Sequence, residues 1–144
     1  MDNINTNDTL TIPREKSCGA VLYTVIAGTR HYVLVSNMNG GNCAIPKGHV
    51  EGNEIEKETA LREIFEETNI HAEFVDGFRK QITILNGTKD IVFFIAKYEN
   101  QSPKCNPNEH DEIMVLPFEE ALAAITWEHT KEVLCEAERF LAGL

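Results

Sequence analysis

The stretch Gly48–Ile70, GHVEGNEIEKETALREIFEETNI, combines a helical pattern with a high density of acidic side chains. Within it, residues 55–68 predict an amphipathic helix, because apolar residues recur four positions apart on one face. The pairs at that spacing are Ala60 with Ile64 and Leu61 with Phe65. Asn69 follows, and asparagine tolerates the left-handed conformation that often ends a helix. We therefore expect this helix to end just before Asn69.

Three glutamates crowd the predicted end of the helix. Glu63 precedes Glu66 and Glu67 by three and four positions, so all three project from neighbouring positions on one face. Like charges at that spacing each cost about 0.2–0.5 kcal/mol, and the helix dipole disfavours anions in the last turn. Because carboxylate oxygens suit Mg²⁺ or Mn²⁺, a bound cation would compensate this repulsion. A solvated acidic helix face is the alternative that composition alone leaves open.

The spacing of particular residues separates these two interpretations. Gly48 is followed after five residues by Glu54, and after seven more by Arg62-Glu63-Ile64-x-Glu66-Glu67-x-Asn69-Ile70. This pattern resembles the Nudix box, G-x5-E-x7-R-E-U-x-E-E-x-G-U, in which U is a bulky aliphatic residue. One defined position departs from it, because Asn69 stands where the family has glycine. Asparagine is the natural second choice for a left-handed residue, so we interpret the departure as tolerated.

The resemblance to the Nudix family implies an α/β/α sandwich with a mixed β-sheet and hydrolysis of a nucleoside diphosphate linked to another group. It also implies divalent metals, Mg²⁺ or Mn²⁺, which neutralise phosphate oxygens while water attacks phosphorus. Carried over by position, the metal ligands are the carbonyl of Gly48 and the side chains of Glu63, Glu66 and Glu67. Arg62 resembles the arginine that orients these carboxylates, and Glu54 matches a box glutamate with a supporting role.

The general base has two candidate positions by the same resemblance. Family members use either a box glutamate or a glutamate from the loop after the central strands. In this chain the second source is the segment Asn-Glu-His-Asp-Glu at residues 108–112, which offers Glu109 and Glu112. The resemblance favours Glu63 or Glu109 as the base and does not decide between them.

Residues just before the box narrow the resemblance to one branch. Ile-Pro-Lys-Gly-His at 45–49, followed by Val-Glu, resembles the P-K-G-H-V-E entry of asymmetric diadenosine tetraphosphate hydrolases, the bis(5′-nucleosyl)-tetraphosphatases. Lys47 would then contact substrate phosphate as a point charge. Trp127 matches an aromatic residue that borders the nucleotide site, although its helical spacing equally suits core packing. Cys43 and Ile84 depart from the branch, which has aromatic residues at these positions.

These departures keep more than one substrate class open. The resemblance favours a dinucleoside polyphosphate such as diadenosine tetraphosphate, with diphosphoinositol polyphosphates and nucleoside triphosphates as alternatives. A non-catalytic Nudix-fold module that binds nucleotides is the alternative outside enzymes. Arg79 is a candidate substrate contact, and the other basic candidates are Arg14, Lys16, Lys80 and Lys89. The histidines at positions 31, 71 and 129 match no functional pattern.

Outside the box, the chain reads as two hairpins, a short strand and a final helix. The expected strands are residues 18–26, 31–36, 74–85, 88–98 and 113–116, with Asn86-Gly87 as the turn of the second hairpin. The run 91–96 is apolar throughout, as expected for a strand that is covered on both faces. Residues 127–141 predict a helix with Thr126 as its N-cap and Trp127 on its apolar face.

Composition limits the kinds of partner. The chain of 144 residues carries a formal net charge of −10, which argues against unaided binding to long nucleic acid or to anionic membranes. The acidic residues are unevenly distributed along the chain. Residues 48–70 hold seven acidic and two basic residues, and residues 109–144 hold nine acidic and two basic residues. We interpret the second cluster, apart from the candidate residues Glu109 and Glu112, as a solvated helix surface. A small nucleotide or polyphosphate substrate remains compatible with this charge if metal ions mediate its binding.

We expect a flexible N-terminal arm at residues 1–13 and a single Nudix hydrolase domain at residues 14–144. The start of the chain lacks the basic and apolar regions of a signal peptide, and no apolar run approaches the roughly 18 residues of a membrane span. Four widely spaced cysteines without a C-x-x-C pair favour reduced thiols and a cytoplasmic protein. The sequence leaves the oligomeric state open.

Overall fold

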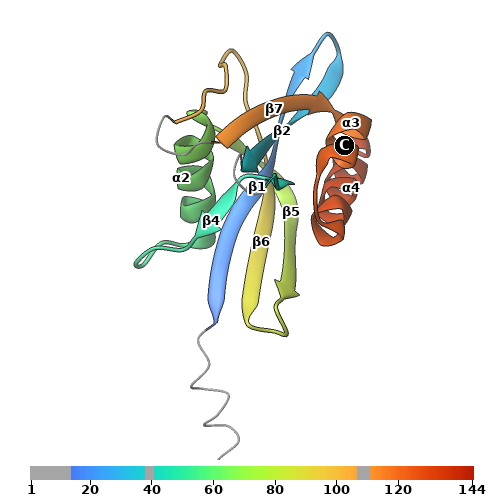
Figure 1. The fold of residues 1–144 in the computed structure, drawn as a ribbon. Coiled ribbons are helices and arrows are strands. Elements are labelled where there is room, and N and C mark those ends of the chain that lie inside the picture. Colours follow the sequence, from blue (N-terminus) through green and yellow to red (C-terminus); the bar gives the residue numbers. More distant parts are fainter. Residues whose placement is uncertain (1–13, 38–40, 107–110) are drawn as a thin grey trace, which may run out of the picture.

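Two long β-hairpins form the centre of the fold (Figure 1). The computed structural model describes residues 14–37, 41–106 and 111–144, so the predicted arm at residues 1–13 lies outside the described residues. β1 (Glu15–Ile26) pairs antiparallel with β2 (Thr29–Asn37), and β5 (Glu73–Ile84) pairs antiparallel with β6 (Lys89–Lys97). The hairpins join through a parallel pairing of β1 with β6. Both hairpins therefore form where the β-rich runs and the turn residues between them predicted them.

Three shorter strands complete a mixed seven-stranded sheet. β3 (Cys43–Ala44) and β7 (Asp111–Pro117) pair antiparallel with β2, and β4 (Lys47–His49) pairs antiparallel with β1. The main path through the sheet runs β3-β2-β1-β6-β5. The pairing of β4 with β1 sets Gly48 opposite Cys18, so the first residue of the box lies at the centre of the sheet.

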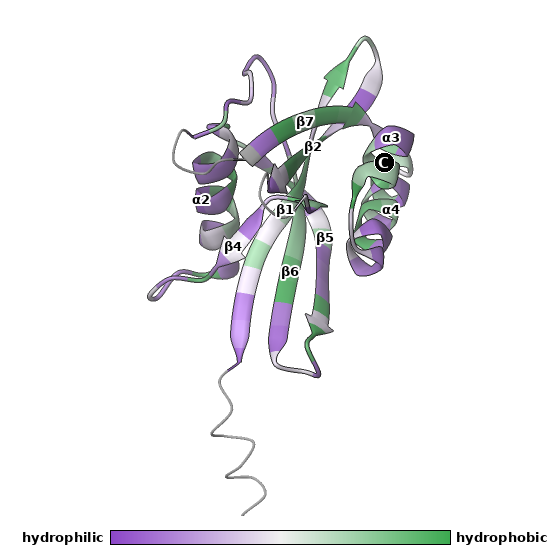
Figure 2. Ribbon diagram, in the orientation of Figure 1, coloured by the Kyte–Doolittle hydropathy of each residue, from purple (hydrophilic) through white to green (hydrophobic). Residues whose placement is uncertain are grey.

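Helices cover both faces of the sheet, which confirms the α/β/α sandwich. α2 (Glu56–Thr68) lies on one face, and α3 (Phe118–Ala124) and α4 (Glu128–Ala142) lie on the other (Figure 1). Strand residues point alternately to the two faces. In β6, Phe93 therefore packs with residues of α3 and α4, whereas Val92 packs with residues of α2. Figure 2 shows the resulting hydrophobic centre of β6, which confirms that this strand is covered on both sides.

The box helix α2 begins and ends close to its predicted limits, but only one of the two apolar pairs on its predicted face is fully buried. Ala60 and Ile64 are fully buried against the sheet, whereas Leu61 and Phe65 are 37% and 41% exposed. Each later residue lies about 100° further round the helix axis, and Leu61 and Phe65 lie outside the part of α2 that the sheet covers. Asn69 adopts φ 61° and its N–H bonds the carbonyl of Phe65 at 2.8 Å, which confirms the predicted left-handed end.

The turn between β5 and β6 is wider than the sequence predicted. Ile84 pairs with Lys89, so four residues close the hairpin instead of the two of a tight Asn-Gly turn. Leu85, Asn86 and Gly87 all have positive φ values. This turn leaves the Leu85 side chain 64% exposed at the end of the hairpin.

The C-terminal helices also differ from the sequence prediction. α3 was not predicted, because its seven residues are too few to give a clear helical period. Thr126 is not the N-cap of α4; its hydroxyl accepts a hydrogen bond from the Cys43 N–H at 2.8 Å. Trp127 occupies the cap position and is 42% exposed, so it does not belong to the buried face of α4.

None of the helices in the described ranges is long and apolar enough to cross a membrane. All four cysteines are free thiols, as predicted. Burial, together with the nearby charge of Glu56, raises the pKa of Cys18 to about 11, so this thiol stays protonated at neutral pH.

Glu138 anchors α4 to the first hairpin. The hydroxyl of Tyr32, which is fully buried on β2, donates a hydrogen bond to Glu138. Arg30 donates two more to the same carboxylate, from Nε at 3.3 Å and from Nη2 at 2.8 Å. Burial alone would raise the pKa of Glu138, but these bonds outweigh it and hold the pKa below its usual value. This carboxylate therefore adds polar contacts between α4 and the sheet to the apolar packing of Val133, Leu134, Ala137 and Leu141.

Replacing Glu138→Ala should lower the free energy of unfolding by about 1–3 kcal/mol, because the buried Tyr32 hydroxyl loses its acceptor and Arg30 loses its partner. Urea unfolding of the two proteins measures the change. Glu132→Ala, an exposed change on the same helix, is the matched control and should be nearly neutral. Equal unfolding midpoints for the two variants would show that the Glu138 contacts do not stabilise the fold.

Candidate active site

The guanidinium of Arg62 gathers the acidic side chains of the box. Its Nε donates to Glu54 Oε2 at 2.7 Å, and its Nη1 donates to Glu63 Oε2 at 2.8 Å and to Glu66 Oε1 at 3.1 Å. Its Nη2 donates to the His49 carbonyl at 2.8 Å. The bond to Glu54, followed by that to Glu63, keeps the pKa of Arg62 above its already high value. A permanent positive charge therefore ties the end of β4 to α2.

Glu54 holds the loop that leads from β4 into α2. Besides Arg62, its carboxylate accepts hydrogen bonds from the Thr59 hydroxyl at 2.8 Å and from the Glu51 N–H at 3.0 Å. These bonds, that from Arg62 first, lower the pKa of Glu54 to about 2. A carboxylate with this many partners positions the loop and Arg62, which agrees with a supporting role in place of direct chemistry.

Gly48 lies directly against the carboxylate of Glu63. A Cβ atom on Gly48 would stand only 2.0 Å from Glu63 Cδ and 2.2 Å from its Oε2. Any side chain at position 48 would therefore displace the carboxylate. Burial raises the pKa of Glu63, although the hydrogen bond from Arg62 opposes that shift. The structure thus brings together Gly48, Glu63 and Arg62, as the sequence predicted.

The donor atoms around Glu63 suit a hard divalent cation. Glu66 shares the Arg62 Nη1 group with Glu63, and one carboxylate oxygen of Glu67 is buried nearby on the same helix. Carboxylate and carbonyl oxygens are the ligands that Mg²⁺ and Mn²⁺ prefer. Among the described residues, however, no three His, Cys, Asp or Glu side chains are already arranged to hold an ion. The residue types therefore suit a divalent metal ion, although Glu63 and Glu66 are hydrogen-bonded to Arg62.

A pocket of about 400 Å³ opens next to Lys47. Its walls are mostly apolar and come from the β5–β6 hairpin and from residues around β3, and the start of α4 adds Trp127 and His129. Burial, and then the positive charge of Lys89, lowers the pKa of Lys47, while Glu67 and Glu63 oppose the shift. Two lysines thus line one pocket, and one of them also interacts with the acidic cluster.

Most of the other basic candidates have acidic partners elsewhere. Arg79 donates to Glu56 at 2.8 and 2.9 Å and does not line the pocket beside Lys47. The remaining pairs are Arg14 with Asp90, Lys16 with Glu56 and Lys80 with Glu136, at 2.5, 2.6 and 3.2 Å. Lys89 alone of these five candidates lines the pocket. Sequence reasoning named Lys89 without ranking it and missed His129, because no motif marks the contact between the hairpin and α4.

The candidate base Glu109 lies outside the described residues, so its predicted role stays a prediction. Glu112, the other acid of that segment, is exposed on β7, where it pairs with Ser36 of β2. Glu63 is the candidate base that the structure does describe, and it lies within the acidic cluster.

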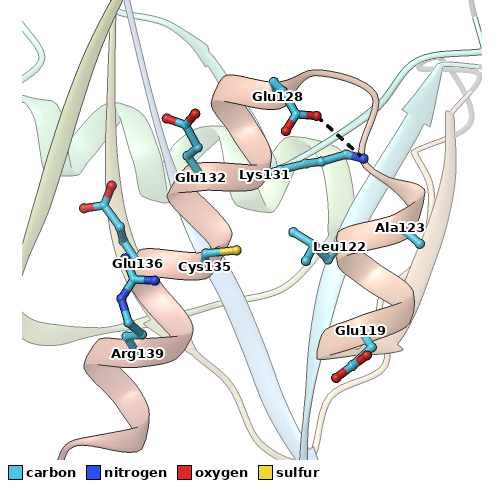
Figure 3. A pocket seen from close by; sticks show the side chains of 9 residues that line it. All are labelled: Glu119, Leu122, Ala123, Glu128, Lys131, Glu132, Cys135, Glu136 and Arg139. Carbon is cyan, nitrogen blue, oxygen red and sulfur yellow. Dashed lines mark ion pairs between the residues drawn. The ribbon is translucent and has the colours of Figure 1, made fainter.

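A larger groove between α3 and α4 contains none of the box residues. Figure 3 shows its apolar floor at Leu122 and Cys135, and its rim carries Glu119, Glu132 and other charged residues. Its volume is about 600 Å³. Glu119, Glu128 and Glu132 lie here on exposed helix surface, as predicted. Glu138 differs from that prediction, because it accepts hydrogen bonds from Tyr32 and Arg30. The groove is larger than the pocket, but it lacks the arrangement of Gly48, Arg62 and glutamates.

Comparison with known proteins identifies the family. A model of the NUDIX domain matches residues 18–137, which includes the box and most of the sheet. The chain belongs to the Nudix family. The Nudix box that the sequence predicted therefore corresponds to the cluster around Arg62, and the left-handed Asn69 is a tolerated departure from its glycine.

Curated relatives of this Nudix protein are enzymes of one kind. A mouse protein named bis(5′-nucleosyl)-tetraphosphatase [asymmetrical] is 32% identical over 141 residues, covering 89% of this chain and 96% of its own length. The protein of the same name from Caenorhabditis elegans is 29% identical, covering 89% of this chain and 97% of its own length. The predicted likeness to the asymmetric tetraphosphatase branch is thus confirmed, and the chain is a Nudix pyrophosphohydrolase.

Solved structures give the same result. The crystal structure of a C. elegans Ap4A hydrolase binary complex has a TM-score of 0.82 and 25% identity, covering 90% of this chain and 99% of its own. The NUDIX domain of Shewanella oneidensis NrtR, solved with ADP ribose, has a TM-score of 0.74 at 17% identity, covering 98% of this chain and 99% of its own. The second likeness shows the Nudix fold alone.

Gly48→Ala should reduce hydrolysis about 100-fold, because a methyl group at this position displaces the Glu63 carboxylate by a distance of the order of 1 Å. Steady-state kinetics measure the loss, and circular dichroism checks the fold. Gly143→Ala makes the same change where the nearest atom to the new Cβ is 3.5 Å away, and it should keep full activity. Wild-type activity in folded Gly48→Ala would mean that the position of Glu63 against Gly48 has no catalytic importance.

Proposed function

We propose that the chain hydrolyses a phosphoanhydride bond of a dinucleoside polyphosphate such as diadenosine tetraphosphate, with Mg²⁺ or Mn²⁺ bound at the box. One observation carries this proposal: Lys47 lines the pocket, while Gly48, the next residue of β4, lies against Glu63. Adjacent residues of a strand face opposite ways. The pocket and the acidic cluster therefore meet at β4, so a polyphosphate bound along the pocket reaches the carboxylates.

The metal ligands in this proposal are the Gly48 carbonyl, Glu63, Glu66 and Glu67. A divalent ion bound there would neutralise phosphate oxygens and lower the barrier to attack by water. Arg62 and Glu54 hold the carboxylates in position, because they bridge α2 and the end of β4. Lys47 and Lys89 supply positive charge to the phosphate chain of the substrate.

The walls of the pocket support this substrate class. They are largely apolar, as in ligand sites that bury a flat heterocycle, and two lysines supply charge for phosphate. The 42% exposure of Trp127 at this pocket supports base stacking over core packing. The names of the curated relatives also favour a dinucleoside tetraphosphate. The cytoplasmic location stays a prediction that rests on the free thiols.

A panel of candidate substrates tests the proposal. With Mg²⁺, diadenosine tetraphosphate should be cleaved with a higher kcat/KM than nucleoside triphosphates or a diphosphoinositol polyphosphate. Glu66→Gln and Glu67→Gln should each abolish turnover with the fold intact, because each removes an anionic metal ligand. Glu58→Gln is the matched control, since Glu58 is exposed on the first turn of the same helix. No cleavage of any compound would favour a module that only binds nucleotides, and full activity in both variants would refute the metal assignment.

The general base is assigned by a second variant. If Glu109 removes the proton from the attacking water, Glu109→Gln should lower kcat by about 10²–10⁴-fold. Rapid-quench or steady-state kinetics on diadenosine tetraphosphate measure this change. Glu99→Gln makes the same replacement at an exposed position after β6 and should leave kcat unchanged. An unchanged rate in Glu109→Gln would instead assign the role to Glu63.

A further inference from the structure

His129 is a pocket residue that no sequence motif marked. It lies in the first turn of α4, two residues after Trp127, and both residues line the same pocket. The imidazole and indole rings are nearly parallel, with an interplanar angle of 10° and centroids 6.3 Å apart. Among the described residues, no hydrogen-bond partner holds the imidazole nitrogens. The ring is thus available to a ligand in the pocket.

The distance between the two rings decides how a third flat group can contact them. Ring planes in direct contact lie about 3.5–4.0 Å apart, so a base between two parallel rings would need them at least about 7 Å apart. The centroids of Trp127 and His129 are 6.3 Å apart, so a base stacks on an outer face of the pair and does not enter between the rings. Both side chains are attached to a backbone segment that hydrogen bonds hold in position. The N–H groups of Thr130 and Lys131 bond the Trp127 carbonyl at 3.1 and 3.0 Å, and Thr126 bonds the Cys43 N–H. The backbone that carries the two rings is therefore fixed by hydrogen bonds before a ligand binds.

The other side chains of the pocket offer few groups that could form hydrogen bonds with the edge of a base. Ile45, Ile84, Leu85 and Phe93 present hydrocarbon, and the two lysines present charge that suits phosphate. Selection among nucleotides must then depend mainly on ring area and stacking. Stacking tolerates different bases because every base has a π face, and larger rings gain more from it.

We propose that His129 is a specificity-determining residue that stacks on the nucleobase together with Trp127. The paired rings then favour purine over pyrimidine nucleotides and discriminate against polyphosphates that carry no base. This inference rests on the proposed function for the identity of the site, but it concerns base binding, which can be measured without hydrolysis.

Trp127 is the one tryptophan of the chain, so its fluorescence reports directly on this pocket. In EDTA, which prevents metal-dependent turnover, ATP and GTP should quench the emission at lower concentrations than UTP. His129→Ala should raise the Kd for ATP and GTP about tenfold, as expected for the loss of one stacking partner. The Kd for tripolyphosphate, measured by competition with ATP, should not change. His129→Phe should restore purine binding, because it keeps an aromatic ring.

Two controls separate stacking from other roles. Glu132→Ala, on the same helix but in the groove of Figure 3, should bind ATP like the wild type. His129→Gln keeps a polar side chain of similar length without a ring, so it should bind purines as weakly as His129→Ala; circular dichroism confirms the fold of each variant.

Three results would overturn the inference: wild-type ATP affinity in His129→Ala, an equal loss of affinity for ATP and tripolyphosphate, or restoration by His129→Gln but not by His129→Phe. Its failure is distinct from that of the proposed function. A protein that cleaves diadenosine tetraphosphate but is insensitive to His129→Ala refutes only the stacking role of His129. Purine-selective quenching without any hydrolysis refutes only the proposed reaction.

Discussion

The guanidinium of Arg62 bonds three glutamates and one backbone carbonyl, and the geometry of the box depends on it. Glu54, Glu63 and Glu66 would otherwise repel one another at the end of β4 and along α2. Charge-assisted hydrogen bonds are roughly twice as strong as neutral ones, and the planar fork of arginine fixes their directions. Arg62 therefore joins the loop to the helix and decides where the carboxylates lie.

The same interaction explains how so acidic a protein can bind a polyanion. Arg62 neutralises only part of the charge between Gly48 and Ile70, where seven acidic residues face two basic ones. A divalent cation would relieve the remaining repulsion and attract phosphate. On the other side of β4, Lys47 and Lys89 repel each other in a partly apolar pocket, and a bound phosphate chain would relieve that repulsion. The excess negative charge of the box and the two repelling lysines lie on opposite sides of β4. A bound metal–polyphosphate complex would reduce the repulsion on both sides.

The acidic cluster could be predicted from sequence because its geometry is local. Glu63, Glu66 and Glu67 share a helix, so their spacing alone brings them together, and the left-handed Asn69 ends that helix as expected. The pocket could not be predicted in the same way. Lys89 and His129 meet there through the packing of a hairpin against α4, and no spacing in the sequence records that contact.

Local pattern also caused the errors of prediction. The apolar pair Leu61 and Phe65 has the right spacing but lies on the side of α2 that the sheet does not cover. Thr126 has the right residue type for an N-cap, yet its hydroxyl bonds the Cys43 N–H of β3. In both cases a tertiary contact, which propensity does not encode, decided the outcome.

The central claim is that Glu63, Glu66 and Glu67, two of which are bonded by Arg62, form a divalent cation site. Direct titration with Mn²⁺, followed by electron paramagnetic resonance without any nucleotide, tests it independently of substrate and turnover. The wild type should bind Mn²⁺, and the double variant Glu66→Gln/Glu67→Gln should lose that binding, while Glu132→Ala keeps it. Equal Mn²⁺ affinity in the wild type and the double variant would contradict the claim.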